Sequence, residues 1–454
     1  MHSKLVITAL LFLLAGCLYT WTFSGIYFHD GAAFLQQVES GNLFHYHLAY
    51  QPVACALAAC VSPLGGSVEW VMGALSVVCG AGVVAGVFWL LAEAVPRWLA
   101  SLVALLVMVT PAIWFGATLI EIHVFAAFMA TVGLVVARRV RPTYGPALGT
   151  GLAMLGHMSG VVLAPAYLAD AVMRDDKRTW RRGLQASGWL VLVVLIIRFV
   201  SETHPASPSR NAPGLEGVFR AIDRELARPD LYTQVWVQLG VLWAALIPLG
   251  LFGLRRKTLV AALSVTIIFA LDYLAVGRML AQYSTIAVPF VAILVGSGLV
   301  RLAGSKLGIA AVVVIAVAHV ASAVPKSLEL LRNEDGQWAE RMQRGLELPN
   351  RIMANGRNRR RLLQSHGLAA HNFSNVPAHF EATGPAGFEA WLRTQLSSST
   401  HVYIDPGVFR DEETPLTPFL EVMESGPFHL RRLEDLGLFE ISYAPSSEAP
   451  DAPR

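Results

Sequence analysis

Residues 5–30, LVITALLFLLAGCLYTWTFSGIYFHD, begin with an apolar run at 5–23 and end on an acid, Asp30. The run is long enough to cross the hydrocarbon core of a bilayer as a helix. Further runs of this kind follow in a chain of 454 residues, of which 54% are hydrophobic and only 15% are charged. The sequence therefore predicts a mainly α, polytopic α-helical membrane protein.

Charge and cysteine content narrow the class further. The formal net charge of +3 is too small to indicate a nucleic-acid partner. The four cysteines, Cys17, Cys55, Cys60 and Cys79, lie in apolar stretches without metal-binding spacing, so we expect small buried hydrophobes. The run that ends at Cys17 is similar to a bacterial lipoprotein signal, but its apolar character continues past that residue, which favours a retained span.

About eleven membrane spans are predicted from the apolar runs. They lie at 5–23, 68–92, 98–115, 121–137, 145–156, 158–173, 184–200, 231–254, 258–276, 281–303 and 307–324. Lys and Arg accumulate in cytoplasmic loops of membrane proteins. Three loops with clusters of them, at 138–141, 174–182 and 255–257, are therefore expected on the cytoplasmic face.

The loop 24–67 is predicted on the outer face, because the chain has no Lys or Arg between Lys4 and Arg97. This loop contains an apolar segment at 50–63 that is short and bounded by prolines. If that segment crossed the membrane, the arginines at 138–141 would lie outside. We therefore expect a re-entrant or interfacial helix there.

With this topology, the turns near Glu121, His157 and Arg278 also face outward, as do the loop 201–230 and everything after residue 325. The loop 201–230 carries four arginines and is an exception to the charge rule.

Two domains are predicted: a transmembrane domain at 1–324 and a small soluble α/β domain at 325–454 on the outer face. The second region is polar, with a helical pattern in AGFEAWLRTQL and strand patterns in THVYID and GLFEIS. The tail 444–454 is expected to be disordered.

The segment after Asp30, GAAFLQQVESG, predicts a short interfacial helix that ends at Gly41. Asp30 then has two interpretations: a helix N-cap, or a general base that takes a proton from an acceptor hydroxyl. The histidines of the same loop, His29, His45 and His47, match no zinc motif and are either surface residues or part of a substrate-binding mouth.

A second group of candidates lies in TPAIWFGATLIEIHVF, residues 110–125, where Glu121 and His123 stand at the outer end of a predicted span. An acid at that depth is costly unless it is used, although a paired or snorkelling carboxylate is the alternative. His157 lies in a Gly-flanked turn, AMLGHMSG, and either packs helices or joins this outer group.

The stretch LDYLAVGRMLAQYST supplies Arg278, Gln282 and Tyr283 on the same predicted face. A lone Arg at a span end often only snorkels. If the substrate is a lipid phosphate, however, a guanidinium suits it, because its planar fork of donors matches phosphate oxygens and keeps its charge.

Taken in order, the first span, the outer loop with GNLFHYHLAYQP, then TPAIWFGATLIEIHVF and LAMLGHMSGVVLAP resemble the GT-C superfamily of membrane glycosyltransferases over residues 5–305. Within it, the chain is similar to bacterial relatives of the protein O-mannosyltransferases. The resemblance implies an enzyme that transfers a sugar from a polyprenyl-phosphate donor to a hydroxyl of a glycan, lipid or protein, with inversion.

The resemblance also implies roles for individual residues. Asp30 matches the base of the first outer loop, although His29 stands where many relatives have a second acid. Glu121 matches the second outer acid, and Arg278 with Tyr283 match groups that hold the donor phosphate.

A divalent metal held by Asp30, Glu121 and a histidine is left open. Two other classes are also left open: a lipid or solute transporter or flippase, which should show repeated halves and ionisable residues near midspan, and a non-catalytic scaffold. The expected location is a bacterial inner membrane, with the site on its outer face.

Overall fold

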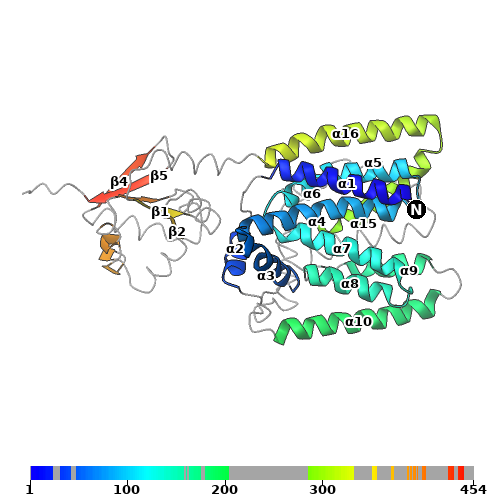
Figure 1. Ribbon diagram of the computed structural model, residues 1–454, viewed down its shortest axis with the longest axis horizontal. Helices are drawn as coiled ribbons and strands as arrows, with labels where there is room; N and C mark the ends of the chain where they lie inside the picture. The colour runs from blue at the N-terminus through cyan, green and yellow to red at the C-terminus, as the bar shows by residue number, and fades with distance from the viewer. Residues whose placement is uncertain are drawn as a thin grey trace, which may run out of the picture. The chain divides into compact units, whose positions relative to one another are not determined.

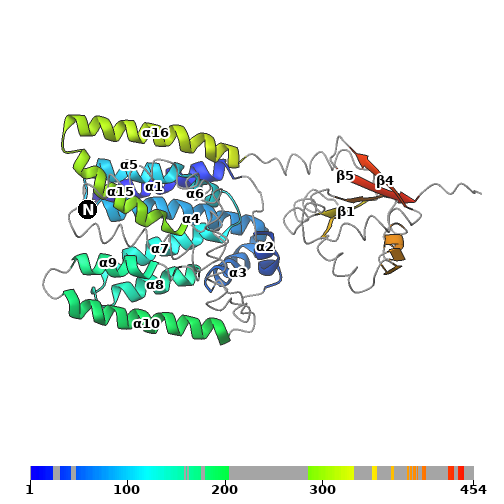
Figure 2. The ribbon, with the colours of Figure 1, turned by 180° about the vertical axis from the view of Figure 1, so that it is seen from behind.

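The computed structural model contains two compact units, Met1–Gly25 with Phe34–Arg332, and Ile26–Ala33 with Asn333–Arg454. The structure describes residues 2–23, 31–41, 48–157, 160, 163–174, 179–203, 285–331, 350–354, 370–372, 386–387, 389–390, 392–394, 396, 401–404, 428–433 and 438–443. The long helices of the first unit form a bundle in which α16 and α10 lie along opposite edges (Figures 1 and 2).

The helices that the structure describes have the following bounds. They are α1 His2–Trp21, α2 Gly31–Glu39, α3 Tyr50–Val61 with the 3-10 turn η1 Ser62–Leu64, α4 Val68–Leu91, α5 Arg97–Val109, α6 Pro111–Ala117, α7 Ile122–Arg139, α8 Gly145–Gly156, α9 Ala164–Arg174, α10 Thr179–Thr203, α15 Val288–Leu302 and α16 Lys306–Leu330. Five of them, α1, α4, α7, α16 and α15 with its preceding turn, are long and apolar enough to cross a membrane. Together they make the chain a multi-pass membrane protein.

The other predicted spans take different forms. The span predicted at 98–115 is a pair of helices, α5 and α6, bent by 61° where Pro111 removes a backbone donor. The spans predicted at 145–156 and 158–173 are the shorter helices α8 and α9, and the span at 184–200 lies within α10. Those predicted at 231–254 and 258–276 lie outside the described residues.

Helix α4 is the centre of the bundle and packs against α1, α5, α6, α7 and α15. Its glycines allow close approach: a Cβ placed on Gly80 would lie 2.5 Å from Ala117 Cβ and 3.0 Å from the Tyr19 ring. Without a strong hydrophobic force between helices in lipid, small residues of this kind let backbones come close enough for dispersion to hold them.

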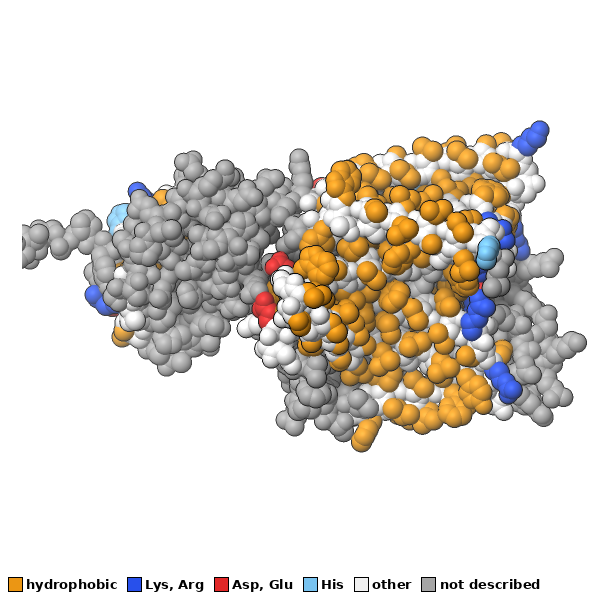
Figure 3. Space-filling view, viewed as in Figure 1, with side chains coloured by type: hydrophobic (Ala, Val, Ile, Leu, Met, Phe, Trp, Pro, Cys, Tyr) orange, Lys and Arg blue, Asp and Glu red, His pale blue; other side chains and the backbone are white. Residues whose placement is uncertain are grey.

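The two ends of the bundle differ in charge. Helix α7 begins after Glu121 and carries Arg138 and Arg139 in its last turn. Because it has 18 residues, about 27 Å separates these groups along its axis. Figure 3 shows Lys and Arg gathered at one end of the apolar helical surface and acidic side chains at the other.

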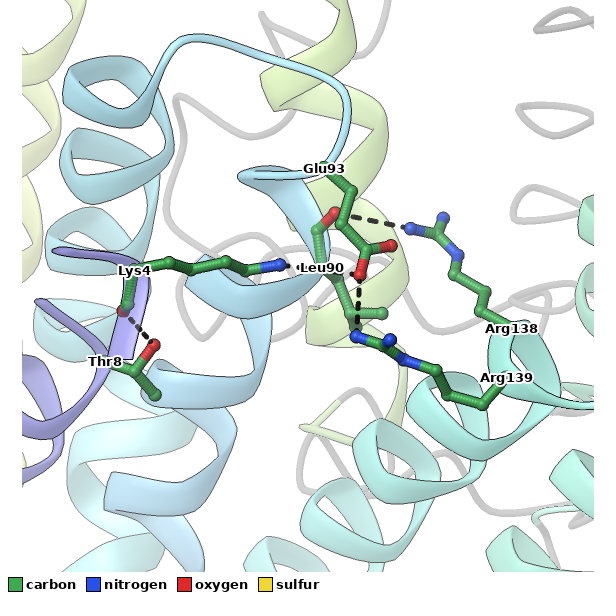
Figure 4. A network of polar contacts seen from close by, with 6 residues as sticks. All are labelled: Lys4, Thr8, Leu90, Glu93, Arg138 and Arg139. Carbon is green, nitrogen blue, oxygen red and sulfur yellow. Dashed lines mark hydrogen bonds and ion pairs between the residues drawn. The ribbon is translucent and has the colours of Figure 1, made fainter. Parts of the chain in front are cut away.

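At the basic end, ion pairs join three helices. Glu93 Oε1, just after α4, lies 3.4 Å from Lys4 Nζ of α1 and 3.2 Å from Arg139 Nη2 of α7 (Figure 4). Arg138 Nη2 lies 3.0 Å from Asp170 Oδ1 of α9. Both acids described here, Glu93 and Asp170, are therefore matched by an arginine or lysine.

The two segments predicted to lie in the interface, after Asp30 and at 50–63, each form a short helix. Helix α2 ends where Gly41 adopts a left-handed backbone with φ 67°, which confirms the predicted stop. Helix α3 has 12 residues, so it is about 18 Å long and too short to cross a hydrocarbon core of about 30 Å. Its buried residues, Tyr50, Gln51, Ala54 and Ala58, share one face, and its opposite face is exposed and apolar.

In the C-terminal unit, the described strands form one five-stranded sheet in the order β2-β1-β3-β5-β4. The strands are β1 Asn350–Ala354, β2 Ala370–Asn372, β3 His401–Ile404, β4 Phe428–Leu433 and β5 Leu438–Tyr443. Strand β1 pairs in parallel with both β2 and β3, and β5 runs antiparallel to both β3 and β4. The strands predicted in THVYID and GLFEIS are confirmed as β3 and β5.

We predict that the two ends of the bundle face opposite sides of the membrane. In a cysteine-free background, Glu39→Cys, on the exposed side of α2, should react with a membrane-impermeant maleimide in intact cells. Arg139→Cys, whose parent side chain is 59% exposed, should react only after permeabilisation. Labelling of Arg139→Cys in intact cells would reverse the predicted orientation.

Candidate functional site

Glu121 occupies the N-cap of α7 and is the centre of the candidate site. Its side chain is only 3% exposed. Glu121 Oε1 accepts a hydrogen bond from the backbone N–H of Ile122 at 2.8 Å, so the carboxylate lies at the positive end of the helix. The same oxygen lies 2.8 Å from His123 Nδ1. Because a carboxylate oxygen can only accept, Nδ1 of His123 carries the proton of this bond.

His157 is brought to the same place from another helix. It lies directly after α8, and its ring centroid is 5.4 Å from that of His123. Helices α7 and α8 approach closely here, because Gly156 faces the Cα of Ala126 and the side chain of Met129. The predicted outer residues Glu121, His123 and His157 therefore form one cluster.

Tyr50, the first residue of α3, completes the aromatic wall of this cluster. Its ring makes edge contacts with Phe34 of α2 at 5.7 Å and with Phe125 of α7 at 5.4 Å between centroids. Burial, and to a lesser degree the Glu121 carboxylate, raises the pKa of Tyr50 well above its ordinary value. The phenol therefore keeps its proton and can donate a hydrogen bond.

Gln51 follows Tyr50 and fixes α3 to α2. Its Nε2 donates to Gln37 Oε1 at 2.8 Å, and Gln51 itself is fully buried. The backbone N–H of Ala49 donates to the carbonyl of Leu155 in α8 at 3.0 Å. Helices α2, α3 and α8 are thus held together at this end by specific polar contacts.

Three buried polar atoms of this region have no hydrogen-bond partner among the described residues: Glu121 Oε2, Tyr50 Oη and Gln51 Oε1. Two of these atoms only accept hydrogen bonds, and the phenol can also donate. Leaving such groups unpaired costs roughly 1–3 kcal/mol each, so a polar ligand that supplies hydrogen-bond donors would be bound favourably here.

The structure describes three of the predicted site residues, Glu121, His123 and His157, and brings them together. Asp30, His29, His45, His47, Arg278, Gln282 and Tyr283 lie outside the described residues, and their roles stay predictions. Helix α2 begins at Gly31, the position directly after Asp30.

The sequence did not indicate Tyr50 and Gln51 as site residues. In the sequence they belong to an apolar segment, and their link to Glu121 is made only by contacts between helices. The signal that could have found them is the pair of polar side chains at the start of an otherwise apolar helix of 12 residues.

Among the residues that the structure describes, no group of three or more His, Cys, Asp or Glu side chains is arranged to hold a metal ion. Glu121 Oε2 supplies one carboxylate oxygen of the kind that divalent ions bind. The sequence left such a metal open, and Asp30, its other proposed carboxylate, lies outside the described residues.

No protein-family model and no curated protein matches the chain. Solved structures do match its fold. ArnT from Cupriavidus metallidurans bound to undecaprenyl phosphate superposes with a TM-score of 0.57 at 14% identity, over 97% of this chain and 98% of that one. The chain has the GT-C fold.

A second similar structure is the archaeal oligosaccharyltransferase AglB from Archaeoglobus fulgidus in complex with an inhibitory peptide and a dolichol-phosphate. Its TM-score is 0.50 at 11% identity, over 98% of this chain and 75% of that chain. The GT-C fold expected from the order of the sequence motifs is therefore confirmed.

We predict that Tyr19 and Tyr50, two of the fully buried tyrosines of the helical unit, respond differently to loss of the hydroxyl. Tyr50→Phe removes a buried atom without a partner among the described residues, so it should raise the free energy of unfolding, by up to about 3 kcal/mol. Tyr19→Phe removes the donor to the Met108 carbonyl at 2.9 Å and should destabilise by about 1–3 kcal/mol. Thermal unfolding in detergent measures both, and equal losses would contradict the unpaired state of Tyr50.

Proposed function

We propose that this chain is an integral membrane glycosyltransferase that moves a sugar from a polyprenyl-phosphate donor to a hydroxyl acceptor at the outer face of a bacterial inner membrane. The observation that carries the proposal is the buried carboxylate of Glu121, with one oxygen fixed by Ile122 and His123 and the other unpaired among the described residues. It lies in a fold shared with ArnT bound to undecaprenyl phosphate.

The chemistry follows from the proposed roles. Asp30 takes the proton of the acceptor hydroxyl, and the hydroxyl oxygen forms a bond to the anomeric carbon of the sugar. The bond between that carbon and the phosphate oxygen breaks, so polyprenyl phosphate leaves with the electron pair and the configuration inverts. Arg278 and Tyr283 are proposed to hold the phosphate as its charge grows.

In this proposal, Glu121 orients the reacting groups. Its free oxygen and the Tyr50 hydroxyl accept hydrogen bonds from the sugar or the acceptor, and His123 keeps the carboxylate in place. His29, His45, His47, His157 and Gln282 are proposed to line the same mouth. The lipid chain of the donor remains in the bilayer, so no nucleotide-sugar site is required.

The two faces of helix α3 support a substrate that has a lipid chain and a sugar head group. Helix α3 carries Tyr50 and Gln51 on its buried face, while its opposite face exposes Val53, Leu57 and Cys60. A lipid-linked donor can contact the exposed apolar surface with its chain and the buried polar surface with its head group.

The experiment measures release of free polyprenyl phosphate by purified protein from a panel of polyprenyl-phosphate sugars, with membrane extract as the source of acceptor. We expect turnover by wild type and a loss of roughly 10²–10⁴-fold in kcat for Asp30→Asn. Glu121→Gln should also lower kcat, because it removes the carboxylate that His123 orients.

Glu69→Gln is the matched control, because Glu69 lies in the first turn of α4 at the same end of the helical unit. It should retain wild-type turnover. Equal turnover by wild type and Asp30→Asn would leave Asp30 as a helix cap, and no release from any donor would contradict the glycosyltransferase proposal itself.

A further inference from the structure

The bend between α5 and α6 leaves backbone carbonyls without their helical partners. Pro111 has no N–H, and the N–H of Thr110 donates to Val107, so the carbonyls of Leu106, Met108 and Val109 receive no backbone bond across the break. In the interior of a membrane, such carbonyls must be satisfied by side chains.

Side chains from α1, from α16 and from the break itself bind these carbonyls, and we call them the break cluster: Tyr19, Thr110, His319 and Ser327. Thr110 Oγ1 and His319 Nε2 lie 2.8 and 3.2 Å from the Leu106 carbonyl. Tyr19 Oη donates to Met108 at 2.9 Å. Ser327 Oγ lies 3.5 Å from the Val109 carbonyl, at the limit of a hydrogen bond.

His319 is the unusual member of the break cluster, because it is a titratable side chain in the middle of an apolar helix and is only 1% exposed. A carbonyl oxygen can only accept, so Nε2 of His319 carries a proton and donates to Leu106. The same nitrogen lies 3.4 Å from Thr110 Oγ1. An ionisable residue within a membrane span is costly and is retained where it has a use.

Helix α16 meets the bundle along one narrow stripe. The buried residues of that stripe are Val312, Ala316, His319, Ala323 and Ser327, and most of its large apolar side chains on the other sides are exposed. Within the described residues, His319 and Ser327 bind α5 at the carbonyls of Leu106 and Val109, and His319 also contacts Thr110 in the break. The position of α16 along the break therefore depends on these two side chains.

The bend between α5 and α6 sets how far along the α5 axis the chain lies before it reaches Glu121. Helix α6 has seven residues, which would advance about 10 Å along the axis of α5 if the two helices were straight. At 61°, the advance is only about half of that. Four residues after α6 the chain reaches Glu121, so the break places the segment before Glu121 about 5 Å less far along the α5 axis than a straight span would.

We propose that His319 is a positioning residue: by donating to Leu106 across the break, it fixes the bend of α5 and α6 and thereby the position of Glu121. The effect on catalysis rests on the proposed function, whereas the effect on the bend does not. His319 lies on α16, far along the chain from α5, and contacts the broken span at the Leu106 carbonyl and at Thr110 Oγ1.

The test compares His319→Leu with His319→Gln. Leucine fills part of the volume without a donor, and glutamine keeps an N–H that can reach the carbonyl. We expect His319→Leu to lower kcat for polyprenyl phosphate release by roughly ten- to a hundredfold, because small displacements of catalytic groups have effects of that size. The KM for the donor should stay within about twofold, and His319→Gln should restore most of kcat.

A second readout does not require turnover. Hydrogen–deuterium exchange of the peptide 106–117 should be faster in His319→Leu than in wild type, and His319→Gln should return it towards the wild-type rate. Val317→Leu is the control for a change on α16, because Val317 is 62% exposed on the side away from the break, and it should alter neither readout.

The outcomes separate the two proposals. If wild type releases no polyprenyl phosphate from any donor, the proposed function fails, and the exchange rates alone decide the role of His319. If His319→Gln behaves like His319→Leu in both readouts, the shape of the ring and not its hydrogen bond holds the break, and the positioning proposal is overturned. Wild-type exchange and turnover in His319→Leu would overturn it as well.

Discussion

Hydrocarbon offers no hydrogen bonds to a protein, and this constraint determines where the polar groups of the helical unit lie. The charged pairs Lys4–Glu93 and Arg138–Asp170 stand at one end, and Glu121 stands at the other. Between them, along the broken span, each carbonyl that lacks a backbone bond contacts a side chain. The hydrocarbon core therefore accounts for the separation of charge along α7. The same separation leaves the Glu121 carboxylate at the end of the bundle where the candidate site lies.

The break in α5 and α6 shows how an irregular backbone persists in such a solvent. A proline in a span leaves unpaired carbonyls, which lipid cannot satisfy. Here α1 supplies Tyr19 and α16 supplies His319 and Ser327, so the bend is held from two sides. The same bend places the chain that follows α6 at the start of α7. The polar contacts of the core and the position of the candidate carboxylate are thus parts of one arrangement.

The sequence predicted those features that depend on local chemistry. The stop of α2 at Gly41, the short helix at 50–63 and the acid at the start of α7 follow from backbone conformation, length and charge. It did not predict contacts between distant segments, such as Tyr50 with Phe125 or His319 with Leu106, which lie 213 residues apart. Those contacts depend on how helices pack, and apolar composition alone does not specify which faces meet.

The candidate site has a cost for folding that the rest of the unit must offset. Glu121 Oε2, Tyr50 Oη and Gln51 Oε1 are buried without partners among the described residues, and unpaired groups of this kind disfavour the folded state. The packing around α4, with close contacts at Gly80, stabilises the bundle whether or not a ligand is present. A ligand that pairs with the three atoms would relieve the cost and add stability in proportion to its binding. Tight packing around α4 therefore offsets the cost of the unpaired polar atoms at α3 and α7. It keeps these atoms in place so that a ligand can bind them.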